Sequence, residues 1–174
     1  MLRKHSFQRG FTLLELLVVI SIIMLIAGFM LPVLSRVREA SYRAKARETV
    51  SQIYTAWTVY YADNRTFPAV NITQMDQIGC AYVNTNLEGN SSVMAMEITI
   101  KESQEGLKDH WGGIFQVRLD NGMSGDAKAY DGQVTVPSVN GNVTIQRPVA
   151  VWSKGKNNGL NGTVDDPGDD IRSW

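Results

Sequence analysis

The chain decides its fold in the stretch Gln8-Arg9-Gly10-Phe11-Thr12-Leu13-Leu14-Glu15-Leu16, which opens an apolar run that continues to Leu31. As a helix, residues 11–31 would measure about 31 Å and would match the hydrocarbon core of a bilayer. The flank before the run holds three basic residues and no acid. Because basic residues on a short flank keep it in the cytoplasm, we expect one membrane span with an exported C-terminal part.

Glu15 is the one acid inside the apolar run. A charged side chain in a membrane helix costs roughly 2.5–3.5 kcal/mol on the insertion scale, so it normally has a partner. A cleaved secretory signal would end in a small-x-small site, and residues 31–35 contain none. A plain signal anchor would explain the run but neither Glu15 nor the Gly10–Phe11 junction.

The phrase Arg-Gly-Phe-Thr-Leu-Leu-Glu, followed by a long apolar stretch, resembles the class III leader of type IV pilins and type II secretion pseudopilins. The resemblance implies that a prepilin peptidase cuts after Gly10 and methylates the new amine on Phe11. It also implies that Glu15 pairs with that amine on a neighbouring subunit as a filament assembles. Such pairing would relieve two charges that are each costly in lipid.

The helix is expected to continue beyond the membrane. Apolar residues recur at helical spacing from Val33 to Trp57, while charged residues fill the other faces, which predicts one helix from Thr12 to about Ala62. Pro32 has no amide hydrogen and clashes with the carbonyl of Gly28, so we expect a bend or local melting there. The resemblance implies that this loosening lets subunits slide during assembly.

The globular half is expected to form a small antiparallel sheet against the helix. Alternating residues at 115–120 predict a half-buried strand. Further candidates are strands at 133–136, 143–146 and 148–152 and short helices at 73–78 and 92–98. One face of the sheet would cover Val50, Ile53 and Trp57, which gives an α+β unit and, with the resemblance, a type IV pilin-like fold. Residues 120–131 superficially match an EF-hand loop, but hairpin turns are favoured because Gly122 offers no ligand.

Five segments follow from these patterns. They are a leader (1–10), a transmembrane half-helix (11–31), a periplasmic half-helix (32–63), a globular domain (64–152) and a C-terminal loop (153–174). The leader holds three of the 17 basic residues and none of the 17 acids, so processing leaves 14 basic residues against 17 acids, a net charge of −3. Nucleic acid is therefore not an expected partner. Cys80 is the only cysteine, which excludes an intramolecular disulfide and favours a buried apolar role over an intermolecular disulfide.

The C-terminal loop is strongly acidic. Four aspartates lie within six positions, namely Asp165, Asp166, Asp169 and Asp170. Their carboxylates repel one another unless they are solvated or bridged by a hard cation, and calcium prefers six to eight oxygen ligands from flexible loops. The alternative is a free acidic tail. Ile171 and Trp174 favour a docked loop, because both are apolar residues able to anchor it.

The closing phrase Asp-Asp-Ile-Arg-Ser-Trp, together with Trp152-Ser-Lys-Gly, resembles the calcium loop of the type II secretion major pseudopilin. The resemblance implies Ca²⁺ bound mainly by Asp169 and Asp170, or supported by them. It places Asn157 where the family usually has an aspartate, so affinity would fall unless Asp165 or Asp166 compensates. Asp166 and Ser173 are weaker candidate ligands.

An enzyme is not expected, because the processed chain has one histidine and one cysteine and offers no nucleophile, base and orienting group together. The patterns favour a homo-oligomeric filament subunit, most simply the major pseudopilin of a type II secretion system. Its implied partners are the prepilin peptidase, other pseudopilins and an inner-membrane assembly platform. Two alternatives remain: a type IV pilin for adhesion, motility or DNA uptake, and a membrane-tethered calcium-dependent binding module.

Overall fold

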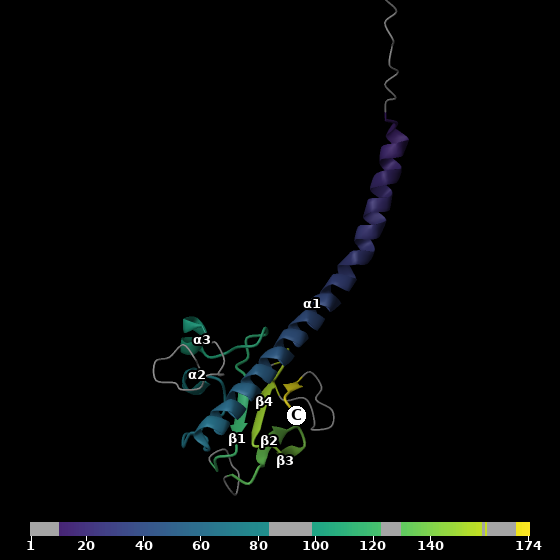
Figure 1. Cartoon of the computed structure of the whole chain (residues 1–174). Coiled ribbons are helices and arrows are strands. Elements are labelled where there is room, and N and C mark those ends of the chain that lie inside the picture. The colour runs from purple at the N-terminus through teal and green to yellow at the C-terminus, as the bar shows by residue number, and fades with distance from the viewer. Residues whose placement is uncertain (1–10, 84–98, 123–129, 158, 160–169) are drawn as a thin grey trace, which may run out of the picture. The chain divides into compact units, whose positions relative to one another are not determined.

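The apolar run begins a single helix, α1 (Leu13–Asn64), which starts and ends within two residues of the expected bounds. The computed structural model describes residues 11–83, 99–122, 130–157, 159 and 170–174. Two short helices follow, α2 (Gln77–Val83) and α3 (Ile100–Glu105). The strands are β1 (Gln116–Leu119), β2 (Val134–Ser138), β3 (Gly141–Ile145), β4 (Val149–Ser153) and β5 (Ile171–Arg172) (Figure 1). The chain divides into two units, residues 1–41 and 42–174.

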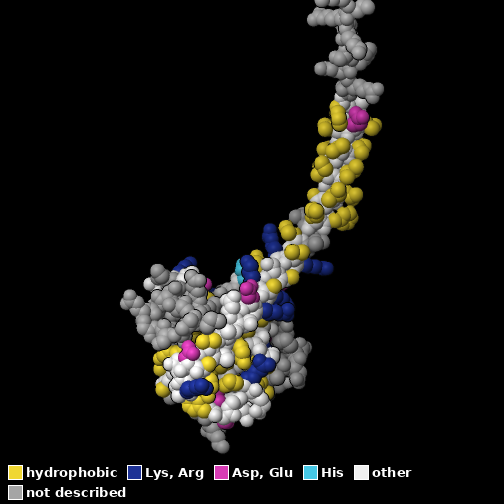
Figure 2. Space-filling model, viewed as in Figure 1, with side chains coloured by type: hydrophobic (Ala, Val, Ile, Leu, Met, Phe, Trp, Pro, Cys, Tyr) yellow, Lys and Arg dark blue, Asp and Glu magenta, His cyan; other side chains and the backbone are white. Residues whose placement is uncertain are grey.

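In the first unit, α1 exposes its apolar side chains. Leu14 is 73% exposed and Ile23 59%, and none of the most apolar stretch is buried against protein. Figure 2 shows apolar side chains along this part of the helix. By length and composition α1 is able to cross a membrane. The helix is continuous through Pro32, so the chain is not locally melted between Gly28 and Pro32 in this structure: the amide lost at proline removes one hydrogen bond, and the turns on either side continue. The bend that was the other expectation there stays a prediction.

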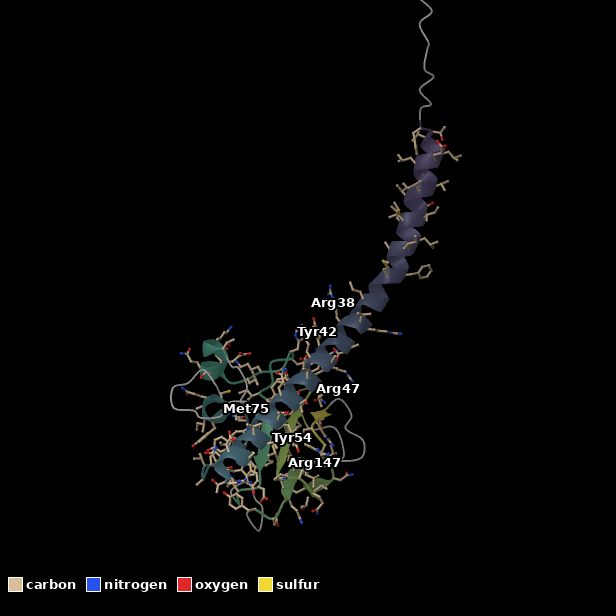
Figure 3. The ribbon with its side chains drawn as sticks, viewed as in Figure 1. Arg38, Tyr42, Arg47, Tyr54, Met75 and Arg147 are labelled. Atoms are coloured by element: carbon tan, nitrogen blue, oxygen red, sulfur yellow. The ribbon has the colours of Figure 1, made fainter. Side chains whose placement is uncertain are left out.

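In the second unit, α1 forms one wall of the main core. Its buried residues recur three and four positions apart at Ala46, Val50, Ile53, Ala56 and Trp57. They share a cluster with alternate residues of β1 and β4, namely Val117, Leu119, Val149 and Val151. The prediction that a sheet covers Val50, Ile53 and Trp57 is therefore confirmed. Trp57 also donates from Nε1 to the sulfur of Met75 at 3.4 Å, and Figure 3 labels Met75 beside this part of α1.

The strands of the described residues form two antiparallel sheets rather than the single sheet expected. One has the order β1-β4-β5 and the other pairs β2 with β3. β4 returns to β1, with Val117 opposite Val151, while the β2–β3 hairpin packs Val134 and Val136 against Ala150 and Trp152. β4 is thus buried on both faces, and all five of its residues are buried. The hairpin therefore packs its apolar side chains on β4 without pairing with a strand of the first sheet.

The helix expected at 73–78 begins later than the sequence indicated. That helix is α2, which starts at Gln77 because the carboxylate of Asp76 accepts the N–H groups of Ile78 and Gly79, both at 3.1 Å. α3 starts after Thr99, which forms a capping box with Glu102. The helix expected at 92–98 lies outside the described residues. Cys80 is fully buried in α2, as predicted, and burial raises the pKa of its thiol.

Asp120 directly follows β1, is 1% exposed, and bonds to the turn that precedes β2. Its two carboxylate oxygens accept the N–H groups of Tyr130 at 2.5 Å and Gly132 at 2.7 Å. Asp131 accepts the N–H of Gln133 at 3.1 Å in the next turn. These contacts are those of turn-capping aspartates at the two ends of the segment, and the preference for turns over an EF-hand loop stays a prediction. Residues 123–129 lie outside the described part of the chain.

Candidate functional site

The start of α1 carries a capping box formed by Thr12 and Glu15. Thr12 donates from its backbone N at 2.9 Å and from its hydroxyl at 2.8 Å to Glu15 Oε2. In return, the N–H of Glu15 donates to the Thr12 hydroxyl at 3.2 Å. These bonds satisfy backbone donors that the first turn of a helix leaves open. Glu15 therefore caps the start of α1, in addition to any role between subunits.

Thr12 is a residue that the sequence reasoning missed. The signal was present, since a threonine followed three positions later by glutamate at the start of an apolar run is the pattern of a capping box. Phe11, the expected site of methylation, is 79% exposed immediately before this cap. Gly10, the expected cleavage site, lies outside the described residues. Phe11 thus lies just before α1, four positions from Glu15 in the sequence, and the cleavage itself is untested.

The C-terminal loop is closed at its neck by the pairing of β5 with β4. Ser153 lies opposite Ile171 and Trp152 opposite Arg172. Ser173 adds two bonds to Val151, donating its backbone N–H at 2.9 Å and accepting the Val151 N–H on its hydroxyl at 3.0 Å. Residues 170–174 are therefore docked on β4.

Asp109 anchors the β4 side of this neck. Its Oδ2 accepts the Ser153 hydroxyl at 2.6 Å, and its Oδ1 accepts the N–H groups of Trp111 at 3.0 Å and Gly113 at 2.8 Å. The Ser153 hydroxyl in turn accepts the N–H of Gly155 at 3.1 Å, which orients the first turn of the loop. Sequence reasoning gave Asp109 no role, because its partner lies far along the chain and has no local signature.

Asp170 is the candidate calcium ligand that the structure describes in most detail. Its Oδ2 accepts Arg172 Nη2 at 3.1 Å, and the side chains of Arg172 and Asp170 are 5% and 0% exposed. Arg172 also lies over the ring of Trp174, 5.4 Å from its centroid, and Trp174 meets Trp152 edge to face. The carboxylate is thus buried at the neck and held by a charge-assisted hydrogen bond.

The other candidate ligands are only partly described. The exposed Asn157 accepts the Gly159 N–H on its Oδ1 at 2.9 Å, an Asx turn at the start of the loop. Ser173 points its hydroxyl at the Val151 N–H, so its main role is strand pairing. Asp165, Asp166 and Asp169 lie outside the described residues. Within the described ranges, no three His, Cys, Asp or Glu side chains gather around a possible metal position.

The described candidate ligands nonetheless have the donor atoms that a hard cation prefers. Asp170 provides a buried carboxylate at one end of the loop, and Asn157 provides an amide oxygen near the other. Both are oxygen donors of the type that calcium prefers, and the neck formed by β4 and β5 brings the two ends of the loop together. The remaining oxygen ligands would have to come from Asp165, Asp166 and Asp169, which lie between them in the sequence, and calcium binding is therefore a proposal.

Comparison with known proteins agrees with the N-terminal geometry. Residues 5–31 match the family model described as the prokaryotic N-terminal methylation motif. Type II secretion system core protein G of Escherichia coli (strain K12) is 37% identical over 70 residues, which is 40% of this chain and 48% of that protein. Core protein G of Pectobacterium carotovorum subsp. carotovorum is 39% identical over 62 residues, which is 36% of this chain and 40% of that protein.

These matches cover less than half the length of each relative, and neither relative is named as an enzyme. The structure has the α+β architecture expected from the sequence, with a long N-terminal helix whose second half packs on small antiparallel sheets. The chain therefore carries the prokaryotic N-terminal methylation motif and resembles type II secretion system core protein G over about two fifths of its length.

Proposed function

We propose that this chain is the main repeating subunit of a type II secretion pseudopilus, a periplasmic filament anchored in the inner membrane. The observation that carries the proposal is the exposed apolar half of α1 with a single carboxylate, Glu15, at its start. The match to the N-terminal methylation motif over residues 5–31 and the two core protein G relatives support it. In this arrangement residues 11–31 cross the membrane and residues 42–174 form the periplasmic domain.

Assembly follows from the charge of Glu15. Within the described residues, its hydrogen bonds come from Thr12, whose amide and hydroxyl are neutral groups. A hydrogen bond does not cancel a full charge in lipid, so the carboxylate still gains from a cation. Cleavage after Gly10 creates such a cation on Phe11, one turn away in the sequence. Two copies staggered along their helices bring the amine of one to the Glu15 of the other.

Mass spectrometry of the native protein tests the processing step. In cells with an active prepilin peptidase, we expect a chain that begins at Phe11 and carries one added methyl group. In cells without the peptidase, the chain should begin at Met1. A chain that keeps Met1 in the presence of the peptidase, or that is cut beyond Leu31, would contradict the proposal. Loss of secretion on gene deletion supports a pseudopilus, whereas loss of long surface fibres indicates a type IV pilin.

The C-terminal loop is proposed to bind Ca²⁺ through Asp169 and Asp170, with Asn157, Asp165, Asp166 and Ser173 as further oxygen donors. The closed neck between β4 and β5 supports this, because calcium binding needs the two ends of the loop to be held together. Calcium would supply positive charge to an acidic loop that has few apolar residues of its own. No zinc-type ligand set is implied, since the donors are oxygens.

A thermal melt with and without chelator tests the loop. At a calcium concentration 10 to 100 times Kd, binding to the native state alone should raise Tm by roughly 3–10 °C over chelator. Asp169→Asn should reduce this rise by removing a charged ligand. Asp131→Asn, which removes a charge from an ordinary turn, should leave it unchanged and is the matched control. Equal melting temperatures with calcium and with chelator would favour a loop that binds no cation.

A further inference from the structure

Two arginines follow the apolar half of α1, just after the proposed membrane span ends. Arg36 and Arg38 are both exposed, and among the described residues neither guanidinium takes part in a hydrogen bond or an ion pair. By contrast, Glu39 and Arg43, the next charged residues of α1, each interact with other groups of the chain. Within the described part of the chain, Arg36 and Arg38 are therefore available to an external anion.

The distance from the apolar run places both arginines close to the level of lipid phosphates. With residues 11–31 in the membrane as proposed, the hydrocarbon core ends near Leu31. A helix rises about 1.5 Å per residue, so the backbone of Arg36 lies roughly 7 Å and that of Arg38 roughly 10 Å beyond this level. The headgroup layer is roughly 5–7 Å thick on each side of the core. Both arginines thus begin at or just outside the headgroups.

The direction of the side chains brings their charges back toward the membrane. In an α-helix every Cα–Cβ bond tilts toward the N-terminus, and in α1 that direction leads to the apolar run. A long arginine side chain near the end of a membrane helix extends its charge to the interface while its methylene groups cover apolar surface. Figure 2 shows basic side chains projecting from α1 directly after its apolar stretch, and Figure 3 labels Arg38 there.

The arrangement around the helix favours lipid over a protein as the partner. Residues two positions apart lie about 200° apart around an α-helix, so Arg36 and Arg38 face nearly opposite sides. Leu34 and Val37, which alternate with them in the sequence, are 48% and 58% exposed. A protein that packs on one face of the helix would reach only one of the two arginines. Lipids surround a membrane helix, and their headgroups meet cations beside exposed apolar side chains.

From this geometry we propose that Arg36 and Arg38 bind the phosphate groups of anionic phospholipids in the leaflet where α1 leaves the membrane. The planar guanidinium matches phosphate through two parallel hydrogen bonds, which makes arginine well suited to this ligand. The inference rests on the proposed membrane span and goes beyond it, because it assigns a lipid partner to two residues outside the span. These contacts fix the depth of the unassembled subunit in the membrane.

The test measures the lipid preference of the full chain in phosphatidylcholine vesicles at about 0.15 M salt. Electron paramagnetic resonance compares the association of spin-labelled phosphatidylglycerol with that of spin-labelled phosphatidylcholine. The double variant Arg36→Gln, Arg38→Gln should lower the preference for phosphatidylglycerol by roughly fivefold or more, since one basic side chain near an anionic headgroup contributes about fivefold. The basic residues before residue 10 are the same in all variants, so their own lipid binding cancels in the comparison.

Arg47→Gln is the matched control. Arg47 is an exposed arginine of the same helix, and it lies 11 positions after Arg36, which is roughly 16 Å further along α1. That distance exceeds the Debye length of about 8 Å, so this variant should keep the preference of wild type. The double variant Arg36→Lys, Arg38→Lys keeps both charges and should retain most of the preference.

The outcomes that overturn the proposal can be told apart, with resistance to alkaline extraction reporting the membrane span. If the double glutamine variant keeps the wild-type preference, the span stands and the arginines do not bind lipid; fewer filaments from that variant would then assign them to a neighbouring subunit. If Arg47→Gln lowers the preference equally, total charge and not position is responsible. If alkali removes the wild-type chain from the vesicles, the proposed span fails and the lipid site fails with it.

Discussion

Glu15→Gln should insert into the membrane normally and yet fail to assemble into filaments. Glutamine at this position still accepts the Thr12 amide and hydroxyl bonds, because a capping box accepts Glu or Gln. It carries no charge, so the amine of a neighbouring Phe11 has no counter-charge in lipid. An unpaired charge there costs roughly 2.5–3.5 kcal/mol, which corresponds to about 100-fold weaker addition of each subunit.

The measurement is the amount of filament recovered from isolated cell envelopes relative to the amount of membrane-inserted subunit, compared across three variants. Glu15→Gln keeps the cap and loses the charge, whereas Thr12→Ala loses the cap hydroxyl and keeps the charge. Glu15→Leu loses both. We expect Thr12→Ala to assemble at a level near wild type, because loss of a helix cap costs only about 1 kcal/mol. Normal filaments with Glu15→Gln would show that Glu15 acts through the helix cap and not through its charge.

Trp57→Ala should destabilise the periplasmic domain by about 3–5 kcal/mol, the usual loss for truncating a buried Trp. Trp57 is 0% exposed at the centre of the cluster that joins α1 to β1 and β4. It also donates to the sulfur of Met75 at 3.4 Å and packs edge to face with Tyr60. A loss of this size is a large share of the roughly 5–15 kcal/mol that stabilises an ordinary domain.

Urea denaturation followed by circular dichroism measures this effect, with Thr58→Ala as the neighbouring control. Thr58 is exposed, and its hydroxyl bonds only to the carbonyl of Tyr54 on the same helix, so its truncation should change stability by less than about 0.5 kcal/mol. Trp57→Phe should fall between the two, since it keeps most of the buried apolar area. If Trp57→Ala and Thr58→Ala were equally stable, α1 would not be part of the folding unit of the domain.

Much of the core was predictable because its signals are local. The alternation of Val117 and Leu119 predicted a strand with one face toward α1, and the spacing of Val50, Ile53 and Trp57 predicted the helix face that receives it. The start of α2 was not predictable to the residue, because it depends on Asp76 capping rather than on apolar periodicity. Helix ends are decided by one or two hydrogen bonds, and a pattern averaged over many residues does not resolve them.

Some residues of the candidate sites could be recognised from the sequence and others could not. Glu15 stands out in the sequence, because a lone acid in an apolar run is conspicuous in composition alone. Asp109 and Arg172 do not stand out, since aspartate and arginine are common surface residues and only burial makes them unusual. Asp109 gains its role from Ser153, and Arg172 from Asp170 held at the neck formed by β4 and β5.

By itself, the sequence determined the long helix, its apolar first half and the single carboxylate at its start, because helix formation and transfer to lipid depend on neighbouring residues and on composition. The tertiary structure alone decided that β4 pairs with β1 and β5, that both faces of β4 are covered, and that Asp170 and Arg172 are buried together. Those choices depend on contacts between distant parts of the chain. Their free energies are small differences between the contributions of burial, hydrogen bonding and chain entropy, and a local sequence pattern does not predict such differences.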